Sequence, residues 1–367
     1  METPVFAQKL GTGKWVGTYY VLDVCPVCSG YGTLKFTGQG LWGCEKCRKG
    51  GRDLSTFRNL LASDPMLKQY VVSIVDPQKP AELIPIAEYS NQYKGKLIGT
   101  GFGSIDYVTG GLTEGALTII TGKRGDGKSC FTGQLALNAV HGHHNVCFYS
   151  GELSAGRFQA WIFAQAAGVR NMEPFTDSFG ATRYTVMVEA EKKIREWMGN
   201  KIVLYDNTKV NASERKTILK CFNKARAYYG SDLFFVDNLM TAQYDMDDEK
   251  NALRAQANFT SAIMDFARTN NVHVVMVAHP RKGEATDINE SVAGLSEITN
   301  MATNVWQVKR FYREEITKEG CDAVLTISKN REYGDTGEFK MTFNKDCKRF
   351  IPQTGSCISK YGWESEA

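Results

Sequence analysis

Several sequence features that define large classes of protein are missing from this chain. It contains no run of about 18 apolar residues, the length that a membrane-spanning helix requires. The first 20 residues show neither the charged and then apolar pattern of a secretory signal nor the arginine-rich pattern of a transit peptide. We therefore expect a cytoplasmic protein that makes no contact with a membrane.

A strong excess of one charge is also missing. The 367 residues carry a formal net charge of only +4, which is too little to indicate nucleic-acid binding by itself. Internal repeats and low-complexity segments are absent as well. Hydrophobic residues make up 43% of the chain, enough for one large domain or two modest ones. Any nucleic-acid function must therefore depend on local sites.

The most specific signal that is present is the sequence GKRGDGKS at 122–129. It follows an apolar run at 116–121 and precedes a helical pattern at 131–140, so it matches the strand–loop–helix setting of a phosphate-binding loop. Backbone N–H groups would surround the phosphates, Lys128 would contact the β- and γ-phosphates, and Ser129 would bind Mg²⁺. The alternative is a glycine-rich surface turn. The residues expected to contact the nucleotide are Gly122, Lys123, Arg124, Gly125, Asp126, Gly127, Lys128, Ser129 and Cys130.

Four of the ten cysteines form a group near the start of the chain. Cys25, Cys28, Cys44 and Cys47 have the spacing C-x₂-C-x₁₅-C-x₂-C, which is typical of a Zn²⁺ site. Four thiolates close the coordination shell, so the metal would be structural rather than catalytic. The alternative is four free thiols. We predict a zinc ribbon over residues 1–53.

The rest of the chain divides into three further segments. An amphipathic helix at 54–70 opens a linker, 54–97, and residues 351–367 form a short tail. Between them, strands and helices alternate over 98–350, which predicts an α/β fold with a mostly parallel sheet. The expected strands are 117–121, 146–150, 202–205, 233–236, 274–278, 304–308, 324–328 and 339–343, and the expected helices are 131–140, 156–167, 182–198, 213–229 and 249–269.

Polar residues follow several of these strands, where ligands of parallel sheets bind. Asp237 is the candidate Mg²⁺ carboxylate, Glu152 can polarise the attacking water, and His279 can donate to the γ-phosphate. Lys329 and Arg331 end a later strand, and Arg331 is the candidate arginine finger for a neighbouring subunit. Each of these residues also has an interpretation without a catalytic role. The aspartate could cap a helix, the glutamate could lie on the surface, the histidine could be a lone histidine, and the arginine could be solvated.

Together these residues resemble the RecA-like superfamily 4 replicative helicases, which include the DnaB type, the Twinkle type and the phage helicase-primases. The resemblance covers residues 98–350. It is carried by TGFGSID at 100–106, TGGL at 109–112, YSGE at 149–152, HPRK at 279–282, SVAGLSE at 291–297 and SKNREYGD at 328–335.

The resemblance implies an ATP-driven ring helicase that moves on single-stranded DNA, unwinds forked DNA during replication and forms a homo-oligomer, expected to be a hexamer. It implies ATP, Mg²⁺ and Zn²⁺ as cofactors, a bacterial or phage-infected cell as the setting, and a separate primase or polymerase as a candidate partner. Arg310 and Phe343 would flank the nucleotide base. The residues expected to contact DNA are Arg281, Lys282, Gly294, Leu295, Ser296 and Glu297.

The chain also departs from this family. Only 50 residues separate Cys47 from Ile98, too few for the primase-like TOPRIM domain of the phage and Twinkle types, so primer synthesis is not expected. Asn300 stands where the family has glutamine. A RadA-like DNA-repair ATPase is the alternative, because it also joins four cysteines to a RecA core and carries a Lys-Asn-Arg element. A non-enzymatic zinc scaffold would require Glu152 and Asp237 to be inert.

Overall fold

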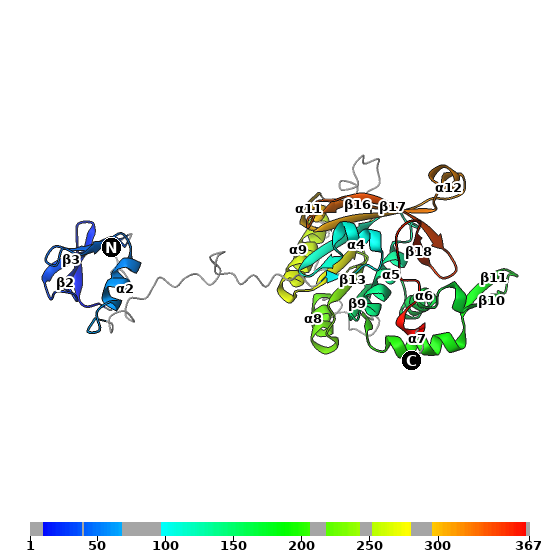
Figure 1. Ribbon diagram of the computed structural model, residues 1–367, viewed down its shortest axis with the longest axis horizontal. Coiled ribbons are helices and arrows are strands. Elements are labelled where there is room, and N and C mark those ends of the chain that lie inside the picture. Colours follow the sequence, from blue (N-terminus) through cyan, green and yellow to red (C-terminus); the bar gives the residue numbers. More distant parts are fainter. Residues whose placement is uncertain are drawn as a thin grey trace. The chain divides into compact units, whose positions relative to one another are not determined.

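The chain forms two compact units, Met1–Tyr93 and Lys94–Ala367 (Figure 1). The computed structural model describes residues 10–38, 40–67, 97–205, 218–242, 252–279 and 296–364. Within that part of the chain, no helix combines the length and the apolar character that crossing a bilayer requires.

The first unit is a small antiparallel sheet followed by one helix. Its five strands pair in chain order, and the helix α2 (Leu54–Ala62) begins where the Asp53 side chain accepts a hydrogen bond from the N–H of Thr56 at 2.8 Å. The strands are β1 (Gly13–Val16), β2 (Tyr19–Val24), β3 (Tyr31–Thr37), β4 (Trp42–Cys44) and β5 (Gly50–Gly51).

Helix α2 belongs to the ribbon and not to a linker, which corrects the expected boundary at residue 54. Phe57 and Leu61 are fully buried in the same cluster as the strand side chains. The Phe57 ring lies 5.3 Å from the ring of Phe36 and 4.6 Å from that of Trp42. The described helix is also shorter than the predicted 54–70, and the segment 68–96 lies outside the described residues. The apolar face of α2 is therefore already covered by its own unit.

The second unit contains a nine-stranded sheet in the order β12-β9-β13-β14-β8-β15-β16-β17-β18. The first six strands run parallel to one another, and β16, β17 and β18 each run antiparallel to the strand before them. The predicted α/β fold with a mostly parallel sheet is thus confirmed. The bounds are β8 (Ala116–Thr121), β9 (Val146–Ser150), β12 (Ile202–Tyr205), β13 (Leu233–Asp237), β14 (His273–Val277), β15 (Asn304–Arg310), β16 (Ala323–Asn330), β17 (Gly337–Asn344) and β18 (Arg349–Pro352).

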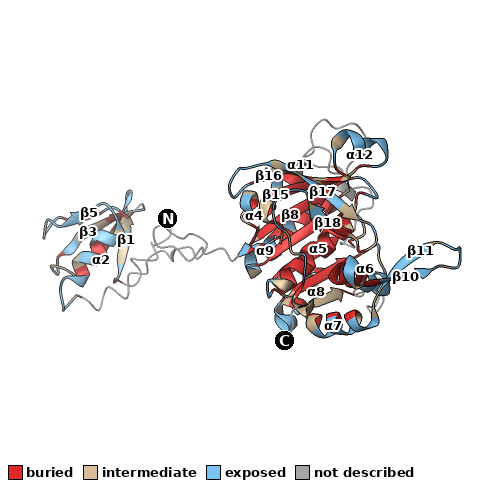
Figure 2. Cartoon of the chain, turned by 45° about the vertical axis from the view of Figure 1, so that its right-hand side comes forward, coloured by how far each residue is buried: buried red, intermediate tan, exposed pale blue. Residues whose placement is uncertain are grey.

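Helices cover both faces of this sheet, whose central strands are buried (Figure 2). Along β13, Leu233 and Phe235 join the core under α5, α6 and α7, whereas Phe234 and Val236 join the core under α8, α9 and α11. Strands buried on both faces read as continuous apolar runs, as these do. The helices are α4 (Gly103–Thr109), α5 (Lys128–His141), α6 (Ala155–Ala167), α7 (Val188–Met198), α8 (Ile218–Tyr229), α9 (Ala252–Asn270), α11 (Ser296–Met301) and α12 (Glu314–Glu319). Short elements are β6 (Leu97–Ile98), β7 (Leu112–Thr113), η2 (Val169–Asn171) and η5 (Gly362–Glu364).

The expected helix 182–198 is only partly correct. Residues Thr182–Val186 form β11, which pairs with β10 (Met172–Thr176) in a hairpin that projects from the body in both views. The helix begins at Val188. The sequence TRYTV at 182–186 is rich in β-branched and aromatic residues, which favour a strand.

The expected tail 351–367 is described as far as residue 364, and this part packs against the core of the second unit. Tyr361 is buried, its hydroxyl donates to the Oδ1 atom of Asn138 at 2.8 Å, and its ring stacks on that of Trp197. The backbone of Cys357 also forms an isolated antiparallel β-bridge with that of Phe102. The second unit therefore continues past residue 350, because these residues close one end of its apolar core.

Candidate nucleotide site and zinc centre

The loop between β8 and α5 needs glycine at three positions. Gly122, Gly125 and Gly127 have φ of 148°, 87° and 86°, a region that favours glycine. A Cβ atom on Gly122 would lie 2.2 Å from the carbonyl oxygen of Val308. Gly127 then caps the amino end of α5, where free backbone N–H groups and the helix dipole attract anions. The loop geometry is that of a phosphate site.

Lys128 lies inside this loop. Its Nζ atom donates to the carbonyl oxygens of Gly122 at 2.7 Å and Lys123 at 2.8 Å. Burial lowers the pKa of Lys128, and the nearby carboxylates of Asp126 and Asp237 oppose this shift. The ammonium group is thus held among the loop atoms that face the pocket.

Asp126 stiffens the loop from within. Its Oδ2 atom accepts the N–H of Lys123 at 2.6 Å, and its Oδ1 atom accepts the N–H of Arg310 at 3.4 Å. Burial raises the pKa of Asp126, and these two backbone donors oppose that shift. Asp126 therefore ties the phosphate loop to the end of β15.

The residues expected beside the nucleotide base contact one another. The guanidinium of Arg310 lies 4.1 Å from the ring centre of Phe343 and 5.1 Å from that of Tyr312. Tyr312 was not predicted, and its hydroxyl donates to the carbonyl oxygen of Gly125 at 3.1 Å. Arg310 and Phe343 both line the pocket beside the loop, and flat aromatic and guanidinium groups suit contact with a planar base.

The polar strand ends meet at this loop. Strands β9, β13 and β14 are neighbours, so Glu152, Asp237 and His279, which follow or end them, are brought together. They share a pocket of about 910 Å³ with the loop. The predicted residues that line it are Arg124, Gly125, Gly127, Lys128, Ser129, Cys130, Glu152, Asp237, His279, Arg310 and Phe343. Trp161, Thr241, Lys345 and Lys348 also line it and were missed, since no motif marks them.

Asp237 and Ser129 form a pair suited to a divalent cation. Burial raises the pKa of Asp237 to about 6, and a hydrogen bond from the Ser129 hydroxyl opposes this shift. A buried carboxylate beside a hydroxyl is a donor set of oxygens, which Mg²⁺ prefers. The residues present therefore fit the metal that accompanies a nucleotide.

Asn238 bridges Glu152 and His279, which sequence reasoning did not foresee. Its Nδ2 atom lies 2.5 Å from the Oε1 atom of Glu152 and 3.0 Å from the Nε2 atom of His279. Burial lowers the pKa of His279, the positive charge of Lys128 lowers it further, and Glu152 opposes both. The histidine is therefore neutral at physiological pH.

Lys329 and Arg331 do not line the pocket of their own subunit. The Nζ atom of Lys329 donates to the carbonyl oxygens of Thr299 at 2.6 Å and Asn300 at 3.3 Å, and Arg331 donates to that of Asn300. Both cations thus bind the carboxyl end of α11, where the helix dipole favours positive charge.

The predicted DNA contacts fall mostly outside the described residues. Arg281, Lys282, Gly294 and Leu295 lie there. Ser296 and Glu297 open α11, and only their backbone is described.

The four predicted zinc ligands lie together in the first unit. The Sγ atoms of Cys25, Cys28, Cys44 and Cys47 are all within 4.8 Å of one another, and those of Cys28 and Cys44 are 3.6 Å apart. Tetrahedral Zn²⁺ with bonds of about 2.3 Å holds its sulfurs about 3.8 Å apart. The cluster therefore fits a structural zinc ion.

The two halves of this cluster have the same backbone turn. In each half, the carbonyl of the first cysteine accepts a hydrogen bond from the backbone N–H of the fourth residue after it. The N–H of Ser29 donates to Cys25 and that of Arg48 donates to Cys44, both at 2.9 Å. Ser29 and Arg48 have φ of 52° and 55°. Burial opposes ionisation of Cys44, but hydrogen bonds, first among them that from the Cys47 N–H, lower its pKa to about 6. These turns aim donors at the thiolates, as a metal site requires.

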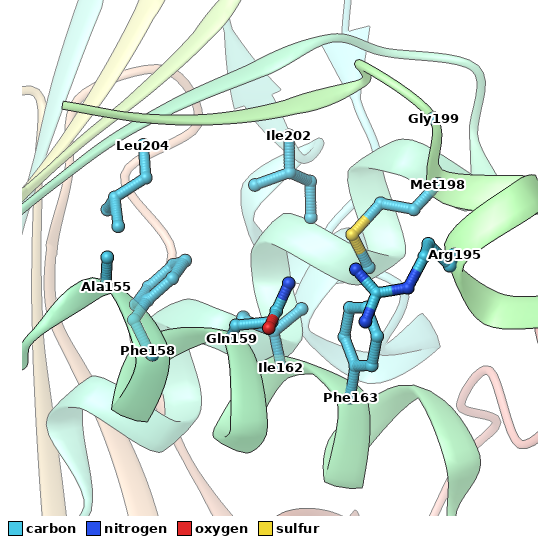
Figure 3. A pocket seen from close by; sticks show the side chains of 11 residues that line it. Ala155, Phe158, Gln159, Ile162, Phe163, Arg195, Met198, Gly199, Ile202 and Leu204 are labelled. Atoms are coloured by element: carbon cyan, nitrogen blue, oxygen red, sulfur yellow. The ribbon is translucent and has the colours of Figure 1, made fainter. Parts of the chain in front are cut away.

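A separate hollow of about 370 Å³ lies between α6, α7 and β12 (Figure 3). Its lining is mainly apolar, including Phe158, Ile162 and Met198. Arg195 is its one charged lining residue, with a guanidinium 5.1 Å from the Phe163 ring centre. No predicted site residue lines this hollow, so the nucleotide chemistry belongs to the other pocket.

Comparison with known proteins agrees with this geometry. The DnaB-like helicase C-terminal domain matches residues 98–352. The ATPase domain of G40P superposes with a TM-score of 0.55 at 14% identity, covering 71% of this chain and 92% of that one. A DnaB-like replicative helicase, described with its interactions with primase, superposes with a TM-score of 0.54 at 15% identity, covering 81% and 74%. The chain therefore belongs to the family of the DnaB-like helicase C-terminal domain, with the RecA-like core of a superfamily 4 helicase.

Proposed function

We propose that this protein is an ATP-driven replicative helicase that assembles into a hexameric ring, moves along single-stranded DNA and unwinds duplex DNA. Its family comprises nucleotide-hydrolysing helicases. The observation that carries the proposal is the meeting of Glu152, Asp237 and His279 with Lys128 around one pocket. Each group matches a part that phosphoryl transfer to water needs.

In this proposal the loop N–H groups and Lys128 hold the phosphates, and the ammonium exchanges its carbonyl partners for phosphate oxygens. Ser129 and Asp237 hold Mg²⁺, which when bound neutralises charge on the β- and γ-phosphates. Glu152, half-exposed at the pocket, orients the attacking water. His279, neutral and largely buried, donates to the γ-phosphate and loses that contact after hydrolysis.

The base would rest against Arg310 and Phe343, which both line the pocket. Stacking on aromatic and guanidinium faces tolerates several bases, so ATP is proposed by analogy with the family. Cys130 and the loop residue Arg124 complete the rim of the same pocket.

The ring is proposed from the family resemblance and from the position of Arg331, the candidate arginine finger. Arg331 lies away from its own pocket, bound to the carbonyl of Asn300. An arginine supplied by a neighbour is a common solution in such enzymes. Forked DNA is the proposed substrate, and a separate primase or polymerase is the proposed partner, in line with the primase interactions of the DnaB-like neighbour.

The zinc ribbon is proposed to contact DNA. A groove of about 680 Å³ on this unit is lined by Tyr19, Lys35, Arg48 and Lys49, among others. Aromatic faces and cations together suit single-stranded nucleic acid. The rival role is docking of a protein partner. Binding that falls steeply with salt and varies little among sequences would support the DNA role.

The test is ATP hydrolysis and strand displacement on a fork with a free single-stranded tail. Wild-type protein should hydrolyse ATP faster with DNA and release the displaced strand. Glu152→Gln should retain ATP and DNA but lose turnover by about 10²- to 10⁴-fold. Hydrolysis without displacement would favour the RadA-like alternative, and no hydrolysis at all would favour the scaffold.

A further inference from the structure

Asn238 occupies the point where the two proposed catalytic side chains meet. It directly follows Asp237 at the end of β13 and is only 1% exposed. Its Nδ2 atom contacts the Glu152 carboxylate at 2.5 Å and the His279 ring at 3.0 Å. A buried amide in this place can influence both side chains at once.

The orientation of the Asn238 amide is set by the turn that follows it. Its Oδ1 atom accepts the backbone N–H groups of Met240 at 3.0 Å and Thr241 at 3.1 Å. The reversed amide would aim N–H groups at those two donors and an oxygen at the Glu152 carboxylate, so these three contacts would be repulsive. The side facing Glu152 and His279 is therefore the donor.

This orientation also assigns the histidine tautomer. Because Asn238 donates to the Nε2 atom of His279, that nitrogen must accept, and the ring proton lies on Nδ1. The Oε1 atom of Glu152 lies 3.4 Å from the same Nε2 atom, and with no proton between them this contact is not a hydrogen bond. Asn238 is the group that connects the two side chains.

We propose that Asn238 is a positioning residue that couples phosphate sensing by His279 to the orientation of Glu152. This inference rests on the proposed function. To donate to a γ-phosphate through Nε2, His279 must carry its proton there, and Asn238 then loses that acceptor. Asn238 remains a donor to one oxygen of Glu152, which leaves the second oxygen free to accept a proton from water.

The sharpest variant is Asn238→Asp, which has the same shape and keeps the oxygen that accepts the Met240 and Thr241 N–H groups. It replaces the N–H donor by a carboxylate oxygen that faces Glu152. We expect kcat for ATP to fall about 10- to 100-fold, the range for hydrogen-bonded outer partners of a site, while the KM for ATP and the melting temperature stay close to wild type.

A double-mutant cycle with Glu152→Gln provides the control. If Asn238 acts through Glu152, Asn238→Asp should cost much less in a Glu152→Gln background than alone. Full, multiplicative losses would overturn the inference. So would an Asn238→Asp variant with normal kcat, or one that loses ATP affinity and thermal stability along with turnover.

The same measurements separate this inference from the function on which it rests. Failure of the wild-type protein to hydrolyse ATP would contradict the proposed function itself, and normal turnover by Glu152→Gln would reject Glu152 as the residue that orients water. Slow turnover by Glu152→Gln together with normal turnover by Asn238→Asp would contradict only the coupling role.

Discussion

The Nζ atom of Lys128 donates a hydrogen bond of 2.7 Å to the carbonyl oxygen of Gly122, within the loop that both residues share. A second bond, to the carbonyl of Lys123, completes the arrangement. The ammonium therefore helps to keep the loop in a shape that matches phosphates. When a nucleotide binds, its phosphate oxygens have to replace these two carbonyl oxygens as partners of the ammonium.

Replacing this lysine should abolish nucleotide binding. In Lys128→Ala the loop loses its buried cation, and the phosphates lose a charge-assisted partner. Equilibrium binding of a fluorescent ATP analogue should show no saturation. Lys224→Ala, which removes an exposed charge from α8, is the matched control and should bind normally. Wild-type affinity in Lys128→Ala would contradict the loop assignment.

Stability of the second unit should depend on pH through His273. Its Nδ1 atom donates to the carbonyl of Thr113 at 2.6 Å, and its Nε2 atom accepts from the Thr118 hydroxyl at 2.9 Å. Burial lowers the pKa of His273 from 6.5 to about 4. Its stabilising contribution is therefore complete above pH 6.5 and is lost as the pH falls toward 4, since the unfolded chain binds the proton first.

The measurement is urea denaturation of the full chain across this pH range. Wild-type free energy of unfolding should fall between pH 6.5 and 4 more steeply than that of His273→Asn, which keeps a donor for Thr113 but cannot titrate. Equal slopes in the two proteins would show that His273 does not titrate in this range.

The ribbon should contain about one Zn²⁺ per chain, measured by elemental analysis. Chelation should unfold this unit, because metal binding supplies folding energy to a domain with so small a core. Cys44→Ser should lose the metal, and Cys221→Ser, which alters a cysteine on α8, should keep it. If Cys44→Ser leaves DNA affinity and ring assembly unchanged, the zinc unit is structural only.

Arg331 should act on the neighbouring subunit. Arg331→Ala should bind ATP and lose hydrolysis, because its own pocket does not contain the side chain. Mixing Arg331→Ala with Glu152→Gln subunits, each inactive alone, should restore some ATPase activity at interfaces where both residues are intact. Co-assembled rings with no activity would argue against the trans assignment.

The residues that sequence reasoning found are those whose chemistry is local. The phosphate loop is eight contiguous residues, and the cysteine pairs depend on short turns, so their geometry follows from the nearby chain. Strand β13 was also predictable, because a strand buried on both faces must be apolar throughout. Asp237 could be placed because it ends that strand, at the edge where parallel sheets bind ligands.

Other features needed contacts between distant parts of the chain. The sequence indicates an amphipathic helix after residue 53, but only the folded unit shows that Phe57 lies against Phe36 and Trp42. Likewise, nothing near Tyr361 indicates that its hydroxyl reaches Asn138 in the core. An apolar helix face predicts that the face is buried, and it does not identify the residues that bury it.

The pocket shows the same division. Glu152 and His279 could be named from the ends of their strands, whereas the amide that joins them could not, because Asn238 resembles an ordinary turn residue in sequence. Its role depends on the order β9-β13-β14, which brings three strand ends side by side. The sequence by itself determined which groups could do the chemistry, through local motifs and periodicity, and the tertiary structure decided which of them touch, because sheet order sets the distances between residues far apart in the chain.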